Sequence, residues 1–210
     1  MDSSHEMNFS ELSDAVYKAL PSKCWEGDKA YREWALDTAV KEKFQWSVED
    51  YKKQGFARRY TFQLFVDRAK ATWKLMQKVV ETFQPELGEG TQIFDFGAGP
   101  GCATAGVASF LHHRNMSASV NASLFDPAEW APAVEALTSS LSWMNADFRC
   151  RDNLQEMLTS FKERVQESDG RFIVILSHVL RDFEGRHLFL AGPEGSCARQ
   201  ACPRTHCGKI

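Results

Sequence analysis

The sequence lacks the long apolar runs of an integral membrane protein, because none of its hydrophobic stretches reaches the length that spans a bilayer. Its first residues, MDSSHEMNFSELSD, are acidic and contain neither the apolar segment of a secretory signal nor the arginines of a transit peptide. The formal net charge is only −3, so any nucleic-acid surface must be a local patch. These absences predict a cytoplasmic protein without membrane contact; a mitochondrial location is the alternative.

The lack of a secretory signal also argues against disulfide bonds, and the six cysteines fall into two groups. Without a secretory signal, those in the body of the sequence are predicted to be reduced core thiols: Cys24, Cys102 and Cys150. The others lie near the C-terminus, close to His206: Cys197, Cys202 and Cys207. Their spacing differs from the C-x2-C of common zinc sites, so we predict no metal; a metal site and a divergent or alternatively spliced end remain the alternative readings.

What is present is enough apolar material for one domain plus an extension, 43% of 210 residues with fifteen Phe and six Trp. Residues 1–88 form a helical region, with helices expected at about 28–48, 47–53 and 57–83. Residues 89–184 form the main domain. Residues 185–210 are rich in turn formers and read as a weakly ordered or divergent tail.

The main domain alternates strands with helices. Strands are expected at 91–96, 118–126 and 147–151 and from residue 171, and helices at 102–113, 127–143 and 153–166. This alternation predicts an α/β fold of Rossmann-like, doubly wound type, with a mostly parallel sheet and helices on both faces. One more strand is possible at RHLFLAG, so the sheet is expected to be incomplete on its C-terminal side.

The stretch IFDFGAGPGCATAG, residues 93–106, joins the first strand to the next helix. Glycines at such a junction let the backbone approach a ligand and expose the helix N-terminus. The spacing of Gly97, Gly99 and Gly101 fits neither the G-x-G-x-x-G dinucleotide fingerprint nor a P-loop. Asp95, in the strand, is costly to bury unless it is hydrogen-bonded, and we expect it to accept backbone N–H groups of the loop or to hold a ligand ammonium group.

The pattern D-x-G-x-G-x-G at the end of a first strand resembles motif I of the class I S-adenosylmethionine-dependent methyltransferases. LFDPAEW, CRDNL and FIVILSHVL resemble the later motifs in the same order, so the similarity covers about 92–183. The resemblance implies S-adenosyl-L-methionine as cofactor and methyl transfer to an acceptor that is RNA, protein or a small molecule. The implied cofactor-binding residues are Asp95, Gly97, Ala98, Gly99, Gly101, Asp126, Asp152 and Ser177.

Each implied role has a plainer alternative. The glycine loop could be a structural turn. Asp126 is placed to accept ribose hydroxyls, or to cap the helix at PAEW. Asp152 is placed to contact adenine, or to cap the helix that follows it. His178, at the carboxyl end of a strand, is a candidate general base, or a satisfied structural histidine.

A narrower similarity is to the mitochondrial small-ribosomal-subunit methyltransferase-like family, carried by DFGAGPG, SHVL and the arginine–tyrosine stretch ARRYTFQLF. It implies an RNA or ribosomal partner, and the basic-aromatic stretch YKKQGFARRY could contact RNA or be an ordinary helix end. Three hypotheses follow: a methyltransferase; a non-catalytic module, or truncated isoform, in ribosome- or RNA-related assembly; and a nucleotide-binding oxidoreductase. The glycine spacing and Asp95 disfavour the third.

Overall fold

The computed structural model describes residues 8–20, 55–150, 154–167 and 171–176. From residue 92 onward, strands alternate with helices as the sequence predicts. The elements are β1 (Gln92–Phe96), α5 (Cys102–His113), β2 (Val120–Asp126), α6 (Ala131–Ser140), β3 (Met144–Cys150), α7 (Leu154–Glu167) and β4 (Phe172–Leu176). Among the described residues, two helices precede them, α1 (Phe9–Ala19) and α4 (Phe56–Phe83). Among the described helices, none combines the length and apolar character needed to cross a membrane.

The four strands form one parallel sheet in the order β3-β2-β1-β4. The chain builds outward from β1 to β3 and then returns to place β4 on the other side of β1. Asp95, near the carboxyl end of β1, lies opposite Leu124 of β2 and Ile175 of β4. This is an α/β fold of Rossmann-like type, as predicted. In such sheets the point where the strand order reverses, at the carboxyl ends of the strands, is where ligands bind.

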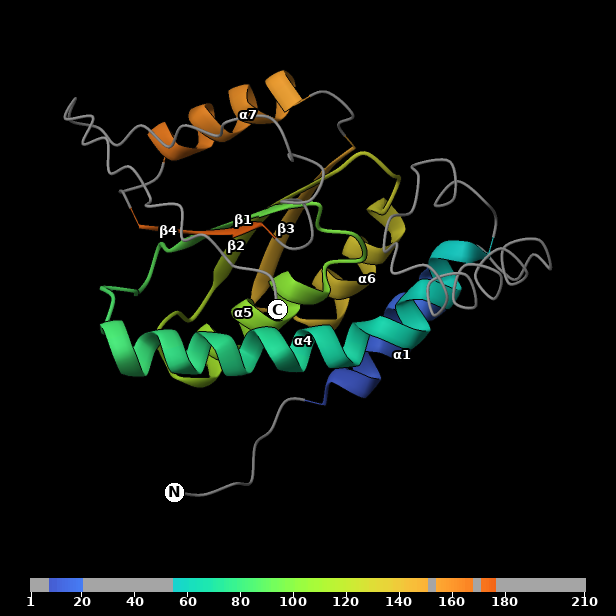
Figure 1. Ribbon diagram of the computed structural model, residues 1–210, viewed down its shortest axis with the longest axis horizontal. Helices are drawn as coiled ribbons and strands as arrows, with labels where there is room; N and C mark the ends of the chain where they lie inside the picture. The colour runs from blue at the N-terminus through green and yellow to red at the C-terminus, as the bar shows by residue number, and fades with distance from the viewer. Residues whose placement is uncertain (1–7, 21–54, 151–153, 168–170, 177–210) are drawn as a thin grey trace, which may run out of the picture. The chain divides into compact units, whose positions relative to one another are not determined.

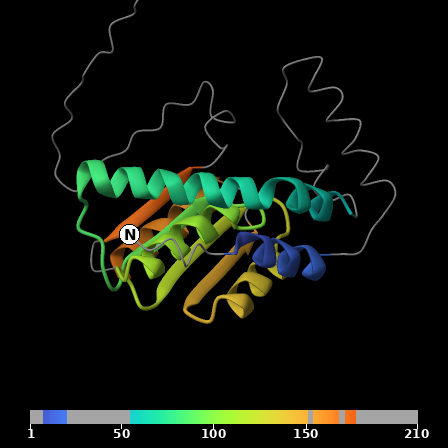
Figure 2. The same ribbon diagram turned by 90° about the horizontal axis from the view of Figure 1, so that it is seen from below.

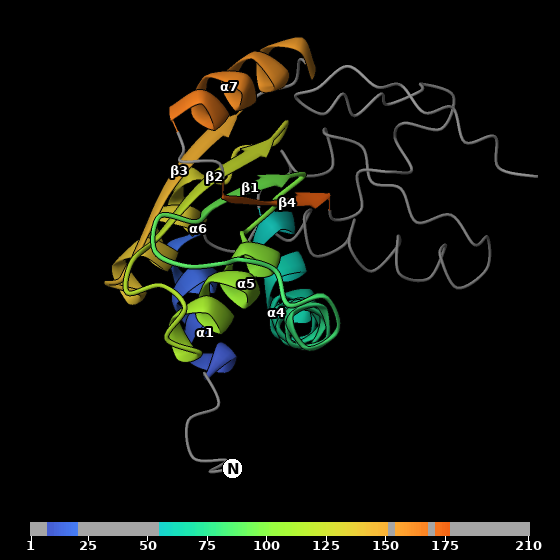
Figure 3. The ribbon, with the colours of Figure 1, turned by 90° about the vertical axis from the view of Figure 1, so that its left-hand side faces the viewer.

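Helices cover both faces of the sheet, as Figures 1 and 3 show. α1, α4, α5 and α6 lie on one face and α7 lies on the other. The reversal of strand order explains the division, because right-handed crossovers that run in opposite directions place their helices on opposite faces. Side chains of β1 alternate accordingly. Ile93 packs into the core of the α5 face, whereas Phe94 and Phe96 pack against Phe161 and Val165 of α7.

α4 and α5 lie side by side and run in the same direction (Figure 2). Trp73, in the second half of α4, meets Phe110 of α5 edge-on, with ring centroids 5.5 Å apart. The helices are closest at Gly106, where a Cβ atom would lie 2.5 Å from the carbonyl oxygen of Ala69. A glycine is therefore needed here because of the neighbouring backbone. α1 packs on α4 through an edge contact between Phe9 and Trp73.

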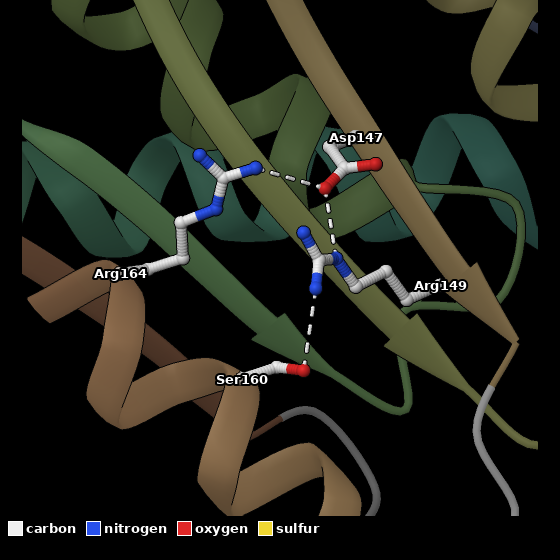
Figure 4. A network of polar contacts seen from close by, with 4 residues as sticks. All are labelled: Asp147, Arg149, Ser160 and Arg164. Carbon is white, nitrogen blue, oxygen red and sulfur yellow. Dashed lines mark hydrogen bonds and ion pairs between the residues drawn. The ribbon is translucent and has the colours of Figure 1, made fainter. Parts of the chain in front are cut away.

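On the opposite face, polar contacts join α7 to β3 (Figure 4), in addition to the aromatic packing on β1. Oδ2 of Asp147 accepts hydrogen bonds from Arg149 Nε at 2.8 Å and Arg164 Nη2 at 3.2 Å. Arg149 Nη1 also donates to the Ser160 hydroxyl at 3.3 Å. One carboxylate thus joins a β3 arginine to an α7 arginine. Because these ion pairs are partly exposed, they contribute little to the free energy of unfolding.

Some sequence predictions need correction. α6 begins at Ala131 and not at Pro127, because residues 127–130 form a non-helical segment in which Glu129 Oε1 accepts the N–H of Ala131. β3 begins at Met144, earlier than expected. α1 was not predicted, although Asn8 and Glu11 form a capping pair at its start. The helices expected at 28–48 and 47–53, and the strand expected at 186–192, lie outside the described residues.

Candidate functional site

The glycine loop turns the chain sharply from β1 into α5. Gly97, Gly99 and Gly101 all have left-handed backbones, with φ of 70°, 54° and 79°. Side chains rarely tolerate this region, so three alternating glycines are the residues that this path requires. At Gly101 a Cβ would also lie 2.6 Å from Cδ1 of Leu137 in α6. The glycines therefore let the start of α5 sit against the neighbouring helix as well as turning the chain.

The amides of the loop are held by the end of β2. Gly97 and Ala98 both donate to the carbonyl of Phe125, at 2.8 and 3.2 Å. Gly99 donates to Oδ2 of Asp126 at 2.8 Å. The prediction that Asp95 accepts the loop amides is wrong, because Asp126 accepts the Gly99 amide and the Phe125 carbonyl accepts those of Gly97 and Ala98.

Asp95 instead forms a hydrogen bond with the first turn of α5. The residue is fully buried, and its Oδ2 accepts the hydroxyl of Thr104, the third residue of α5, at 2.7 Å. The helix N-cap is Gly101, which has no side chain, so Asp95 supplies from the strand the carboxylate that favours a helix N-terminus. Its other oxygen, Oδ1, is buried without a hydrogen-bond partner among the described residues.

Burial raises the pKa of Asp95 to about 7; hydrogen bonds from Thr104 oppose the rise, and the charge of Asp126 adds to it. A carboxylate in this state is not fully satisfied by the protein around it. Native structures leave few buried polar atoms unpaired, and those that exist often mark functional sites. Asp95 is therefore the side chain at this edge of the sheet that most clearly favours a cationic partner.

Asp126 uses both of its oxygens. Oδ2 accepts from Gly99, and Oδ1 accepts from the N–H of Ala128 at 2.8 Å. Burial raises its pKa to about 6, opposed by the amides of Ala128 and Gly99 and by the side chain of Trp130. The predicted role as a helix cap is wrong, because the N-cap of α6 is Trp130. The ribose role stays a prediction; each carboxylate oxygen can accept a second hydrogen bond.

α4 supplies a wall of the site that the sequence analysis did not identify. The Tyr60 ring lies next to the loop, with Cε1 3.9 Å from where a Cβ of Gly99 would be. The same ring packs against Trp130, with centroids 6.0 Å apart, and its hydroxyl accepts a hydrogen bond from Arg68. Tyr60 lies within the stretch ARRYTFQLF, which the sequence already marks as basic and aromatic. Nothing in it, however, shows that α4 runs parallel to α5, and only this contact between distant segments brings Tyr60 to the loop.

The basic-aromatic stretch containing Tyr60 is partly described. The guanidinium group of Arg58 lies 4.2 Å from the centroid of the Tyr17 ring, and that of Arg59 lies 5.7 Å from the Phe62 ring. Both cations thus stack on aromatic side chains at the α1–α4 contact. The RNA contact of this stretch stays a prediction, and residues 51–54 lie outside the described part.

Several predicted residues lie outside the described part of the chain: Cys24, Asp152, Ser177, His178, Cys197, Cys202, His206 and Cys207. Cys102 is a free, buried thiol, as predicted. Burial raises the pKa of its thiol to about 11, and the charge of Arg68 opposes the rise. Within the ranges that the structure describes, no cluster of three or more His, Cys, Asp or Glu residues could hold a metal ion.

The site therefore combines a left-handed glycine loop at a helix N-terminus, two buried carboxylates beneath and beside it, and an aromatic wall. This arrangement favours a ligand that carries a positively charged group, since a buried carboxylate is stabilised in its ionised form by a nearby cation. Searches against protein-family models and against curated proteins find no match to this chain.

Proposed function

We propose that this protein binds S-adenosyl-L-methionine at the glycine loop and transfers its methyl group to an acceptor. The observation that carries the proposal is the fully buried Oδ1 of Asp95, which has no hydrogen-bond partner among the described residues and lies beneath a loop of three left-handed glycines. A ligand ammonium group would provide the missing hydrogen bond. The cofactor's own charge would favour the ionised carboxylate, whose burial is otherwise costly.

The residues present fit this cofactor. Gly97, Ala98, Gly99 and Gly101 give close access to the backbone at the start of α5. Asp126 is buried at the carboxyl end of β2, where a ribose is held in related nucleotide folds, and has acceptor capacity left. Asp152 and Ser177 remain predicted contacts. When bound, the cofactor supplies a methyl group already activated by positively charged sulfur.

The protein's own contribution would then be to position the acceptor. A base is needed only for an acceptor that carries a proton at neutral pH, and His178 remains the predicted candidate. The resemblance to the ribosomal branch makes RNA the first acceptor class to test. The cytoplasmic location is likewise a prediction, which imaging of the tagged full chain would decide.

A dinucleotide fits less well. Its pyrophosphate carries no positive group, so it would leave the buried Oδ1 of Asp95 without an ammonium partner and would face Asp95 and Asp126 with negative charge alone. The loop also departs from the dinucleotide spacing.

The test is calorimetric titration of the full chain with S-adenosylhomocysteine and, in a separate titration, with NAD. Asp126→Ala should weaken the binding of S-adenosylhomocysteine at least about tenfold. The substitution removes both the acceptor of the Gly99 amide and the predicted acceptor of the ribose hydroxyls. The exposed Asp67→Ala on α4 is the matched control and should bind as wild type does. A folded wild-type chain that binds NAD, or that binds neither ligand, would contradict the proposal.

Binding and catalysis are separated by a second measurement, transfer of a labelled methyl group to total RNA and to protein. Transfer that Asp126→Ala loses supports the enzyme. Tight binding of S-adenosylhomocysteine without transfer to any class favours the non-catalytic module instead.

A further inference from the structure

Two contacts fix the position of α4 beside the glycine loop. Near its start, the Tyr60 ring lies against Gly99. Nine residues later, the carbonyl of Ala69 lies so close to Gly106 that only glycine fits there. Because these contacts hold both ends of this stretch against the loop and α5, they fix the position of its side chains relative to the candidate site.

Arg68 lies within this stretch and reaches back toward the helix start, the direction that side chains on a helix favour. Its Nη1 donates to the Tyr60 hydroxyl, and its Cζ lies 5.2 Å from the centroid of the same ring. Among the described residues, this phenol is its only side-chain partner, and no carboxylate pairs with it. A guanidinium has five N–H donors in a planar fork, so most of its hydrogen-bonding capacity is unused.

The place of this cation is unusual. A guanidinium near a helix N-terminus is electrostatically disfavoured, since the helix dipole puts positive charge there too. Burial raises the pKa of the Cys102 thiol and the charge of Arg68 opposes the rise, as expected for a guanidinium group near the first residue of α5. Arg68 is thus a half-buried positive charge beside a helix N-terminus that no carboxylate of the described residues pairs with, and such a charge suits an anionic group of a ligand.

The opposite side of the loop carries the opposite charge, since Asp95 and Asp126 lie on the sheet side. The loop is thus bordered by a cation from α4 and by carboxylates from β1 and β2. A ligand group that carries both charges on adjacent atoms, an α-amino acid, matches this pattern.

We infer that Arg68 binds the carboxylate of the ligand's amino-acid end, while Asp95 receives its ammonium group. Tyr60 acts as the positioning residue, since its hydroxyl and ring hold the guanidinium toward the loop. Arginine suits this role better than lysine because its fork can bind a carboxylate with two parallel hydrogen bonds. The inference rests on the proposed function, because it assigns one end of the same ligand.

The experiment compares two probes by calorimetry on the full chain. S-adenosylhomocysteine carries the amino-acid group, whereas 5′-methylthioadenosine has the nucleoside and thioether without it. Arg68→Met keeps the length of the side chain and removes its charge. It should weaken S-adenosylhomocysteine binding by about 10- to 100-fold, as expected for a lost charge-assisted hydrogen bond, and leave methylthioadenosine binding unchanged.

Two further variants separate positioning from folding. Arg68→Lys should recover part of the lost affinity, since it restores the charge but not the fork. Tyr60→Phe keeps the ring and removes the hydroxyl, and should weaken S-adenosylhomocysteine several-fold without affecting methylthioadenosine. Circular dichroism and thermal melts of each variant confirm that the protein is folded.

The outcomes are distinguishable. If Arg68→Met binds S-adenosylhomocysteine as wild type does, or loses both probes equally, Arg68 does not recognise the carboxylate and only this inference fails. If the folded wild type binds neither probe, the proposed function itself fails. Loss confined to S-adenosylhomocysteine supports both.

Discussion

The N–H of Gly99 donates a 2.8 Å hydrogen bond to Oδ2 of Asp126, across 27 positions of the sequence. The bond joins the glycine loop after β1 to the carboxyl end of β2, and it makes the loop's conformation depend on one buried side chain. Because the other oxygen of Asp126 holds Ala128, the same carboxylate also fixes the turn that precedes α6.

Asp126→Asn tests this dual role. An asparagine has one acceptor oxygen and one NH₂ donor, so either Gly99 or Ala128 must lose its acceptor. We expect hydrogen exchange at one of these two amides to become faster by roughly tenfold or more, a loss of more than about 1 kcal/mol of local protection. Amide exchange followed by NMR measures it, with Asp67→Asn as control. Unchanged protection at both amides would contradict the assignment.

Asp95 makes stability depend on pH. Its pKa is raised from 3.8 to about 7, so the folded protein binds this proton more tightly than the unfolded chain does. Stability from this group is complete below pH 3.8 and is lost as pH rises through 7. At pH 8, ligand-free Asp95→Asn should be more stable than wild type, by on the order of 3 kcal/mol.

Urea denaturation at pH 4 and at pH 8 checks the pH effect. The gap between Asp95→Asn and wild type should be small at pH 4 and large at pH 8, whereas Asp67→Asn should follow wild type at both. An equal gap at both pH values would show that the ionised form of Asp95 is not the destabilising one.

Gly106→Ala tests the close approach of α4 and α5. The new methyl group would meet the Ala69 carbonyl at 2.5 Å and Cβ of Thr72 at 3.0 Å. We expect a loss of about 1–3 kcal/mol from overpacking, although alanine is intrinsically better in a helix. Ser109→Ala on the same helix is the control. Its buried hydroxyl has no partner among the described residues, so that variant should be neutral or stabilising.

Glu89 joins two loops at the amino end of the sheet. Its carboxylate accepts the N–H of Ala118 at 2.8 Å and the hydroxyl of Ser119 at 3.1 Å. These bonds, the one from Ala118 first, lower the pKa of Glu89 below 4.5. Its stabilisation is therefore present above pH 4.5 and is lost as pH falls through the lowered pKa.

Glu89→Gln should accordingly unfold at lower urea concentration than wild type at pH 7, with the difference shrinking toward pH 3. Glu86→Gln, in the same loop and exposed, is the matched control and should leave the midpoint unchanged at both pH values. A difference that persists at pH 3 would mean that the carboxylate's charge is not what holds the loops.

The start of α1 offers a test of its cap. Oδ1 of Asn8 accepts the N–H of Ser10 at 3.2 Å, and its Nδ2 donates to Glu11 Oε1 at 2.7 Å. Asn8→Ala should cost about 1 kcal/mol, and Asn8→Asp should preserve most of the capping. Urea denaturation of the two variants side by side measures the difference; equal losses would argue against capping.

Local sequence patterns predicted most of the described fold. The bounds of α5 were predicted as they are found, because its start follows three glycines and its residues are small and apolar. The start of α6 was misplaced because Asp-Pro reads equally well as a helix cap and as the turn that it forms here. Whether a carboxylate caps a helix or holds a distant loop depends on a neighbouring strand that the local pattern does not contain.

The same distinction explains the candidate site. The glycines and the two aspartates stand out in the sequence by residue type and spacing. Their partners do not: Thr104 was an ordinary helix residue, and Tyr60 and Arg68 lay in a region interpreted as a separate helical segment. Which carboxylate holds the loop depends on a contact between distant segments. That contact follows from the register of β1 with β2, which places the end of β2 beside the glycine loop.

The parallel course of α4 beside α5 also determines the smallest piece of this protein on which binding can be studied. A fragment cut at residue 89, before the first strand, would keep the glycine loop, Asp95 and Asp126, but would lose Tyr60, Arg68 and the aromatic packing on Phe110. It would also leave the close-packed side of α5 at Gly106 open to water. The helix before the sheet is therefore structurally inseparable from the sheet, and any expression fragment should begin before Phe56.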